Sequence, residues 1–117
     1  MAGHISRQRN ADLAAQKPQS VYARVKKAGV HGGYAAILLD SCMGCAVHRT
    51  LAAGQGYTTV EIKVNFVRAM TDRTGKVRAE GNIINVGGHI AIAEGRLTDG
   101  SGRLLAHGTS TCLIFPI

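Results

Sequence analysis

Val30-His31-Gly32-Gly33-Tyr34-Ala35-Ala36-Ile37-Leu38-Leu39-Asp40 is the stretch that decides the fold, because two glycines open an apolar segment that runs into a single carboxylate. Small and apolar side chains continue to about Leu51, and their density lets a helix lie close against a sheet. We therefore predict one central, largely buried helix. Its N-terminus presents unpaired backbone N–H groups to a developing negative charge, and Asp40 among apolar neighbours can act as a base or a nucleophile. The stretch favours an acyl-transfer site.

The sequence after this helix predicts four antiparallel strands that follow one another as a meander. Residues 60–67 alternate between apolar and polar side chains, and residues 77–86 do the same until the phase moves at Ile84, as a bulge would cause. Residues 89–98 and 103–115 complete the set. Turns are predicted at Asp72-Arg73-Thr74-Gly75, at Gly87-Gly88 and at Asp99-Gly100-Ser101-Gly102. The fold class is therefore α+β, with one helix followed by four strands.

The first 28 residues are predicted to form an atypical basic segment ahead of a domain that spans residues 29–117. Asn10 can cap a short helix over residues 11–15, and Val21, Ala23 and Val25 can form a brief edge strand. A chain of 117 residues supports one domain with an adequate but not generous core, so we expect an oligomer. Neither an apolar run of roughly 18 residues nor a signal-type start is found, and a cytoplasmic location is expected.

The net charge of +7 is concentrated at the N-terminus, where residues 1–30 hold six basic residues and one aspartate. Such a segment can contact nucleic-acid phosphates, although it contains one aromatic residue and no recognition motif, and it can equally be a solvated tail. A modestly basic domain also suits an acidic small ligand such as a coenzyme A thioester. We expect a small ligand rather than nucleic acid.

Cys42-Met43-Gly44-Cys45 followed by His48 can be interpreted as a redox or zinc motif. A tetrahedral zinc site needs a fourth ligand, and none stands at a characteristic spacing. We interpret the pair as small apolar packing inside the buried helix and expect no metal and no cofactor.

Five motifs in order resemble the hotdog-fold acyl-CoA thioesterases of the phenylacetate-degradation type, over residues 29–115. These motifs are His31-Gly32-Gly33, Asp40, the 54–59 segment GQGYTT, the 63–68 segment KVNFVR and Val86-Gly87-Gly88. The resemblance implies a long helix wrapped by an antiparallel sheet, two protomers joined at their sheet edges, and active sites between the two helices. The family also places an asparagine before the His-Gly-Gly motif, whereas residues 21–29 here contain none.

Helix geometry leads independently to a shared site. Gly32 and Asp40 are eight residues apart, which is about 12 Å along a helix. One carbonyl needs both the oxyanion donor and the attacking group at about 3 Å. Gly32 of one protomer must therefore act with Asp40 of another, as a twofold axis allows.

The candidate catalytic residues are Gly32 as oxyanion donor, Asp40 as base or nucleophile, and His31 as an orienting group. His31 can instead simply cap the loop, and Asp40 can be an ordinary surface carboxylate. For substrate and coenzyme A we expect contacts from Gly33, Thr59, Asn65, Phe66, Arg68, Ala69, Gly87, Gly88 and His89. The resemblance places Thr59 opposite the acid, whereas threonine also simply favours strands, and Gly87-Gly88 also makes a turn with no ligand.

Three functions follow from the sequence. The first is hydrolysis of acyl-CoA thioesters with an aryl or medium-chain acyl group, in an apolar pocket bounded by helix residues such as Met43 and Val47, by a homodimer or dimer of dimers. The missing asparagine favours an alternative, an impaired module that binds acyl-CoA without hydrolysing it. A nucleic-acid-associated protein comes third and depends on the basic segment alone.

Overall fold

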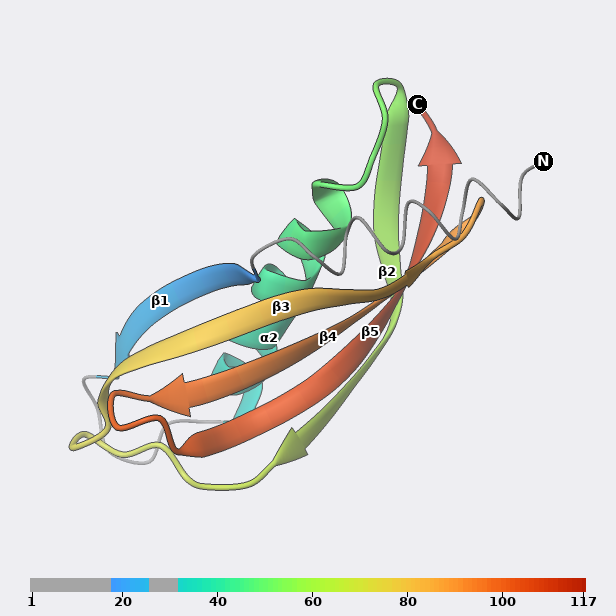
Figure 1. Ribbon diagram of the computed structural model, residues 1–117. Coiled ribbons are helices and arrows are strands. Elements are labelled where there is room, and N and C mark those ends of the chain that lie inside the picture. The colour runs from blue at the N-terminus through green and yellow to red at the C-terminus, as the bar shows by residue number, and fades with distance from the viewer. Residues whose placement is uncertain (1–17, 26–31) are drawn as a thin grey trace.

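The computed structural model describes residues 18–25 and 32–117. One helix lies across one face of a five-stranded antiparallel sheet (Figure 1). The elements are β1 (Gln19–Val25), α2 (Gly32–His48), β2 (Gln55–Phe66), β3 (Gly75–Val86), β4 (Ile90–Asp99) and β5 (Leu104–Pro116). The predicted α+β hotdog architecture is confirmed, including the brief edge strand over residues 21–25. The helix predicted at 11–15 lies outside the described residues.

The strands are arranged in the order β1-β3-β4-β5-β2. β3, β4 and β5 form the predicted meander, but β2 departs from it, because it pairs with β5 at the far edge, with Ile62 opposite Ser110. Alternation of apolar and polar side chains reports the face of a strand and not its neighbour, so the prediction of a continuous meander was wrong at β2. β1 occupies the other edge through its pairing with β3.

The core lies between α2 and the concave face of the sheet. The buried side chains of the helix recur every three or four residues, which places them along one stripe. They are Ala35, Leu38, Leu39, Cys42, Met43, Ala46 and Val47. From the sheet, Val77, Ala79, Ala91, Ala93 and Leu97 complete the same core. The helix ends at His48, three residues before the predicted end, and backbone hydrogen bonds from Thr50 to Val47 and from Leu51 to His48 form the turns that follow it.

Three glycines form a row beneath the helix. Gly81, Gly95 and Gly108 are register partners on adjacent strands. A Cβ atom at Gly81 would lie 2.3 Å from the carbonyl oxygen of Cys42, and one at Gly95 would lie 3.1 Å from Leu39 and Met43 side-chain atoms. The helix can therefore approach the sheet closely because Gly81 and Gly95 lack side chains, whereas a Cβ atom at Gly108 would meet the backbone of Lys63 on β2.

Register shifts interrupt three of the ladders, and the shift in the β4–β5 ladder lies between Leu97 and Thr98. The predicted bulge is confirmed in β3, where the register shifts between Ile83 and Asn85. A second bulge in β2 shifts the register between Thr59 and Glu61, at Val60.

No helix in the described part of the chain is long and apolar enough to cross a membrane.

Candidate functional site

Asp40 lies near the middle of α2, on the side of the helix that faces β2. Its Oδ1 atom accepts a hydrogen bond of 3.5 Å from the Thr59 hydroxyl. The carboxylate is exposed and opens into a hollow of about 220 Å³ whose other walls are the apolar side chains of Ala36, Ile37 and Ile62. The structure thus brings the predicted acid and the predicted hydroxyl together.

The bulge at Val60 makes this hollow possible. Successive side chains of a regular strand alternate between faces, so Thr59 and Ile62 would point in opposite directions. Both line the hollow beside Asp40, since the extra residue in β2 changes the alternation between them. The sequence gives no signal for this bulge, because the apolar pattern from Val60 to Phe66 looks unbroken.

Tyr57 packs beside the Asp40 hollow without lining it. A Cβ atom at Gly44 would lie 2.7 Å from the Tyr57 hydroxyl, and the ring centroids of Tyr57 and His48 are 6.2 Å apart. Burial raises the pKa of the Tyr57 phenol, and the nearby Cys112, Cys45 and Asp40 raise it further. Asp40, Gly44 and His48 are spaced four residues apart in the sequence. This spacing could have predicted that the three residues share the helix face on which Tyr57 packs.

Gly32 opens the helix at a second hollow of about 300 Å³. Phe66 covers Gly32 so closely that a Cβ atom there would lie 3.2 Å from two carbons of its ring. Arg68 and Ala69 follow Phe66 along the same wall, and Met70, Leu97 and Leu105 form the apolar base. Four predicted residues, Gly32, Phe66, Arg68 and Ala69, are therefore neighbours in one chain.

The two hollows are separate in a single chain. Gly32 and Asp40 share the helix, and the rise of eight residues sets them about 12 Å apart. Each lies in its own cavity with no lining residue in common. His31, the third predicted catalytic residue, lies outside the described residues.

The other predicted binding residues are not gathered in either hollow. Gly87, Gly88 and His89 connect β3 to β4 at one end of the sheet, whereas Phe66 pairs with Ala106 toward the other end (Figure 1). Asn65 occupies the opposite face of β2 from Phe66, as strand alternation requires. Gly33 is half-buried in the first turn of the helix.

The expected pocket walls Met43 and Val47 lie in the core instead. Both are fully buried between the helix and the sheet, so they line neither hollow. Both belong to the stripe of the helix that faces the sheet, whereas Ala36 and Ile37, which line the hollow at Asp40, lie outside that stripe.

The two cysteines of the Cys-x-x-Cys motif lie in different surroundings. Cys42 is buried as predicted, and burial raises the pKa of its thiol to about 12. Cys45 is exposed, so the interpretation of the pair as core packing holds for Cys42 and fails for Cys45. Among the residues that the structure describes, no three histidine, cysteine or acidic side chains are grouped to hold a metal ion.

Comparison with known proteins assigns this arrangement to a family. A family model described as the thioesterase superfamily matches residues 27–106. The chain belongs to the thioesterase superfamily. By class it is a thioester hydrolase, and its architecture is the hotdog fold. No curated protein sequence gives a significant match.

Solved structures support the assignment of this thioesterase-superfamily chain. A Bacillus halodurans protein crystallised with CoA is 28% identical at a TM-score of 0.76, covering 83% of this chain and 67% of that one. A phenylacetic acid degradation-related protein of Ralstonia eutropha is 24% identical at a TM-score of 0.68, covering 81% and 76%. A Haemophilus influenzae thioesterase is 17% identical at a TM-score of 0.78, covering 99% and 91%. The latter two likenesses concern the fold.

Proposed function

We propose that this protein hydrolyses acyl-CoA thioesters at a site completed by a second copy of the chain. The observation that carries the proposal is the separation of Gly32 from Asp40 into two hollows on one helix. A thioester carbonyl must lie within about 3 Å of both the oxyanion donor and the attacking group. In one chain the two groups are about 12 Å apart. A twofold axis between antiparallel helices would bring Gly32 of one protomer beside Asp40 of the other.

The surface around Asp40 suits such a partner. β2 forms a sheet edge of twelve residues, so one side of its backbone has no neighbouring strand in the described chain. Val60 on this strand is 57% exposed and Ile37 on the helix is 64% exposed. Long apolar edges are covered by pairing in stable proteins. We therefore assign the β2 edge to a homodimer contact with a second β2.

In the proposed reaction, Asp40 acts on the carbonyl carbon while the partner's Gly32 donates its backbone N–H to the carbonyl oxygen. The positive end of the helix dipole strengthens that donation. Asp40 either removes a proton from the attacking water or attacks the carbon itself to form a mixed anhydride that water then opens. In both routes the carbon–sulfur bond breaks, the CoA thiolate leaves and takes up a proton, and the free acid remains.

The remaining residues would bind the substrate. Thr59 holds the acid through its hydroxyl, and Ile37 and Ile62 give the hollow an apolar lining that suits an aryl or medium-chain acyl group. Arg68 supplies a cation for the coenzyme phosphates beside Phe66 and Ala69. The CoA bound by the Bacillus halodurans relative supports a coenzyme A thioester as the substrate.

The assignments that stand apart from the hollows remain proposals on sequence grounds. They are an orienting role for His31 and substrate contacts by Gly33, Asn65, Gly87, Gly88 and His89. Within one chain the β3–β4 hairpin and Phe66 lie toward opposite ends of the sheet. Contacts of this hairpin with the coenzyme would therefore come from a partner protomer.

A dimer of dimers is supported by the convex face of the sheet. Ile84, Ile90 and Leu113 are exposed at one end of that face, and Ile90 and Leu113 are register partners. Exposed clusters of this kind mark association surfaces. The cytoplasm is the proposed compartment, in keeping with three free cysteines.

A complementation experiment tests the shared site directly. Gly32→Val blocks the donor and Asp40→Asn removes the acid, so each homodimer should lose release of free thiol from a panel of aryl- and medium-chain acyl-CoA substrates. Random mixing of the two variants by refolding gives heterodimers with one intact site, and about a quarter of wild-type turnover should return. A mixture as inactive as its components would disprove the shared site.

The same substrate panel separates an enzyme from a binding module. Release of free CoA by the wild-type protein supports hydrolysis. Thermal stabilisation by acyl-CoA without any release would replace the proposal with the alternative of a non-catalytic binding module.

A further inference from the structure

A third cavity, of about 390 Å³, opens on the convex face of the sheet, which is the face turned away from α2. Its walls include Tyr22 of β1, Lys76 and Arg78 of β3 and Thr98 and Asp99 of β4, and the β4–β5 turn borders it. We call this cavity the convex groove. It shares no residue with the hollows at Gly32 and Asp40.

The convex groove carries positive charge that the described residues do not neutralise. Lys76 lines the groove, and Arg24, its register partner, lies next to the lining residues, so two like charges stand opposite each other on β1 and β3. No carboxylate of residues 18–25 or 32–117 lies within ion-pair distance of either, whereas Arg78 is paired with Glu80 at 3.0 Å. Like charges in cross-strand positions destabilise a sheet. An anion bound between Arg24 and Lys76 would remove that cost.

An aromatic ring lies beside these cations. The Lys76 Nζ atom is 5.2 Å from the centroid of the Tyr22 ring, and Arg78 Cζ is 5.9 Å from it. The Ser20 hydroxyl accepts two hydrogen bonds from the Arg78 guanidinium, which fixes its position. Tyr22 remains 58% exposed, so its ring offers stacking area for a planar group.

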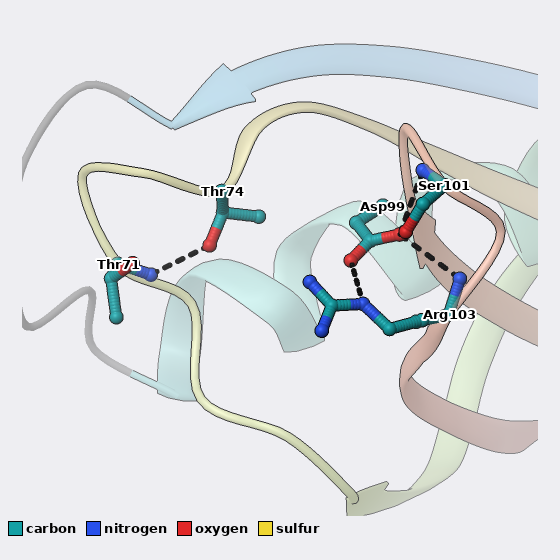
Figure 2. Close-up of polar contacts among 5 residues, drawn as sticks. All are labelled: Thr71, Thr74, Asp99, Ser101 and Arg103. Carbon is teal, nitrogen blue, oxygen red and sulfur yellow. Dashed lines mark hydrogen bonds and ion pairs between the residues drawn. The ribbon is translucent and has the colours of Figure 1, made fainter.

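The β4–β5 turn gives the convex groove a rigid wall. Asp99 accepts hydrogen bonds from the Ser101 hydroxyl at 2.8 Å and from the backbone N–H groups of Ser101 and Arg103, and its second oxygen pairs with Arg103 Nε at 2.9 Å (Figure 2). These donors engage both oxygens of the carboxylate. Asp99 is therefore held in the turn and does not neutralise Lys76, consistent with the absence of an ion pair between them.

We propose that the convex groove binds a nucleoside phosphate, with the base against Tyr22 and the phosphates at Lys76, beside its register partner Arg24. A planar ring and an anion in one ligand match the two features that the groove combines, a partly exposed aromatic ring and a lysine that none of the described carboxylates pairs with. The cavity volume lies within the range of small-molecule sites. The convex groove lies across the sheet from both hollows and shares no lining residue with them.

Calorimetric titration of the full-length protein with ADP tests the proposal, with adenosine and pyrophosphate as partial ligands. ADP should bind more tightly than either partial ligand. Lys76→Gln and Tyr22→Leu should each weaken ADP binding roughly tenfold. Lys63→Gln, which removes an exposed lysine from β2, should leave it unchanged. Equal affinity for ADP and pyrophosphate, or unchanged binding in the groove variants, would overturn the proposal.

Backbone amide shifts of the wild-type protein provide a second measurement that needs no variant. Saturation with ADP should move the signals of Gly100 and Gly102 at the groove rim. Binding that leaves both signals in place would overturn the assignment to this groove. Tighter binding of a short single-stranded oligonucleotide than of ADP would also overturn it, in favour of a nucleic-acid surface.

Two sources could supply the nucleotide, a free nucleotide or the adenine nucleotide end of coenzyme A. Steady-state kinetics of Tyr22→Leu distinguishes them. An unchanged KM for acyl-CoA identifies the free nucleotide, and a raised KM with unchanged kcat identifies the coenzyme. The ADP titration requires no catalysis, so its failure and the failure of the thioesterase proposal are separate results.

Discussion

The Thr59 hydroxyl lies 3.5 Å from Oδ1 of Asp40, although the two residues are 19 positions apart in the chain. One belongs to the middle of α2 and the other directly precedes the bulge of the edge strand β2. The contact joins the helix to the sheet edge where the homodimer is proposed to form. It therefore couples the position of the acid to the strand that would hold the second protomer.

Replacing Asp40 with Asn should lower thioester turnover roughly 100-fold or more, because the amide can neither remove a proton nor attack the carbonyl. The side chain is exposed, so folding and association should be preserved. Free-thiol release measures the turnover, and circular dichroism with light scattering checks the fold and the dimer. Wild-type turnover in a folded Asp40→Asn dimer would rule out the assigned role.

Thr59→Val should reduce kcat roughly tenfold, since a hydrogen bond to a charged group is lost while the shape of the side chain is kept. Thr58→Val is the matched control, because Thr58 lies next along β2 and is exposed away from the acid. Equal effects of the two substitutions on kcat would contradict an acid-orienting role for Thr59.

Val60→Lys should convert the proposed oligomer to monomers and abolish turnover, because a charge at the β2 edge opposes edge-to-edge pairing. Ile84→Lys, on the convex face, should stop assembly at an active dimer. Light scattering reports the mass of each variant. A Val60→Lys protein that retains the wild-type mass would place the subunit contact elsewhere.

Gly81→Ala should destabilise the fold by about 3 kcal/mol or more, because the new methyl group would meet the Cys42 carbonyl at 2.3 Å and the helix would have to move away. At Gly88 a Cβ atom meets nothing within 4 Å, so Gly88→Ala is the control and should change stability little. Urea denaturation measures both free energies. Similar values for the two variants would contradict the close helix contact.

Asp99 should make stability depend on pH in the acid range. Hydrogen bonds from Ser101 and Arg103 lower the pKa of this carboxyl from 3.8 to about 2. A lowered folded-state pKa gives stabilisation that is present above the unfolded value and lost as pH falls from about 4 towards 2. Asp99→Asn should therefore reduce stability at neutral pH, and the difference from wild type should shrink over that range. A difference that stays constant down to pH 2, or one matched by the exposed Asp72→Asn control, would refute the assigned stabilisation.

The sequence by itself determined the helix and the strands, and it identified the candidate residues around Asp40. The glycine pair ahead of an apolar run located α2, and alternation located β2 to β5, because backbone periodicity and turn chemistry are local properties of a chain. Asp40, Thr59, Phe66 and Arg68 were likewise found from motifs. The separation of Gly32 from Asp40 needed only the helix rise.

Tertiary structure alone decided which strands are neighbours and which side chains meet. The pairing of β2 with β5 and the bulge at Val60 decide that Thr59 and Ile62 share the Asp40 hollow. Packing between the helix and the sheet buries Met43 and Val47, which the sequence suggested as pocket walls. Tyr22, Lys76 and Thr98 meet in the convex groove only because β1, β3 and β4 are adjacent. Register and strand order follow from the packing of the whole chain, which local periodicity does not encode.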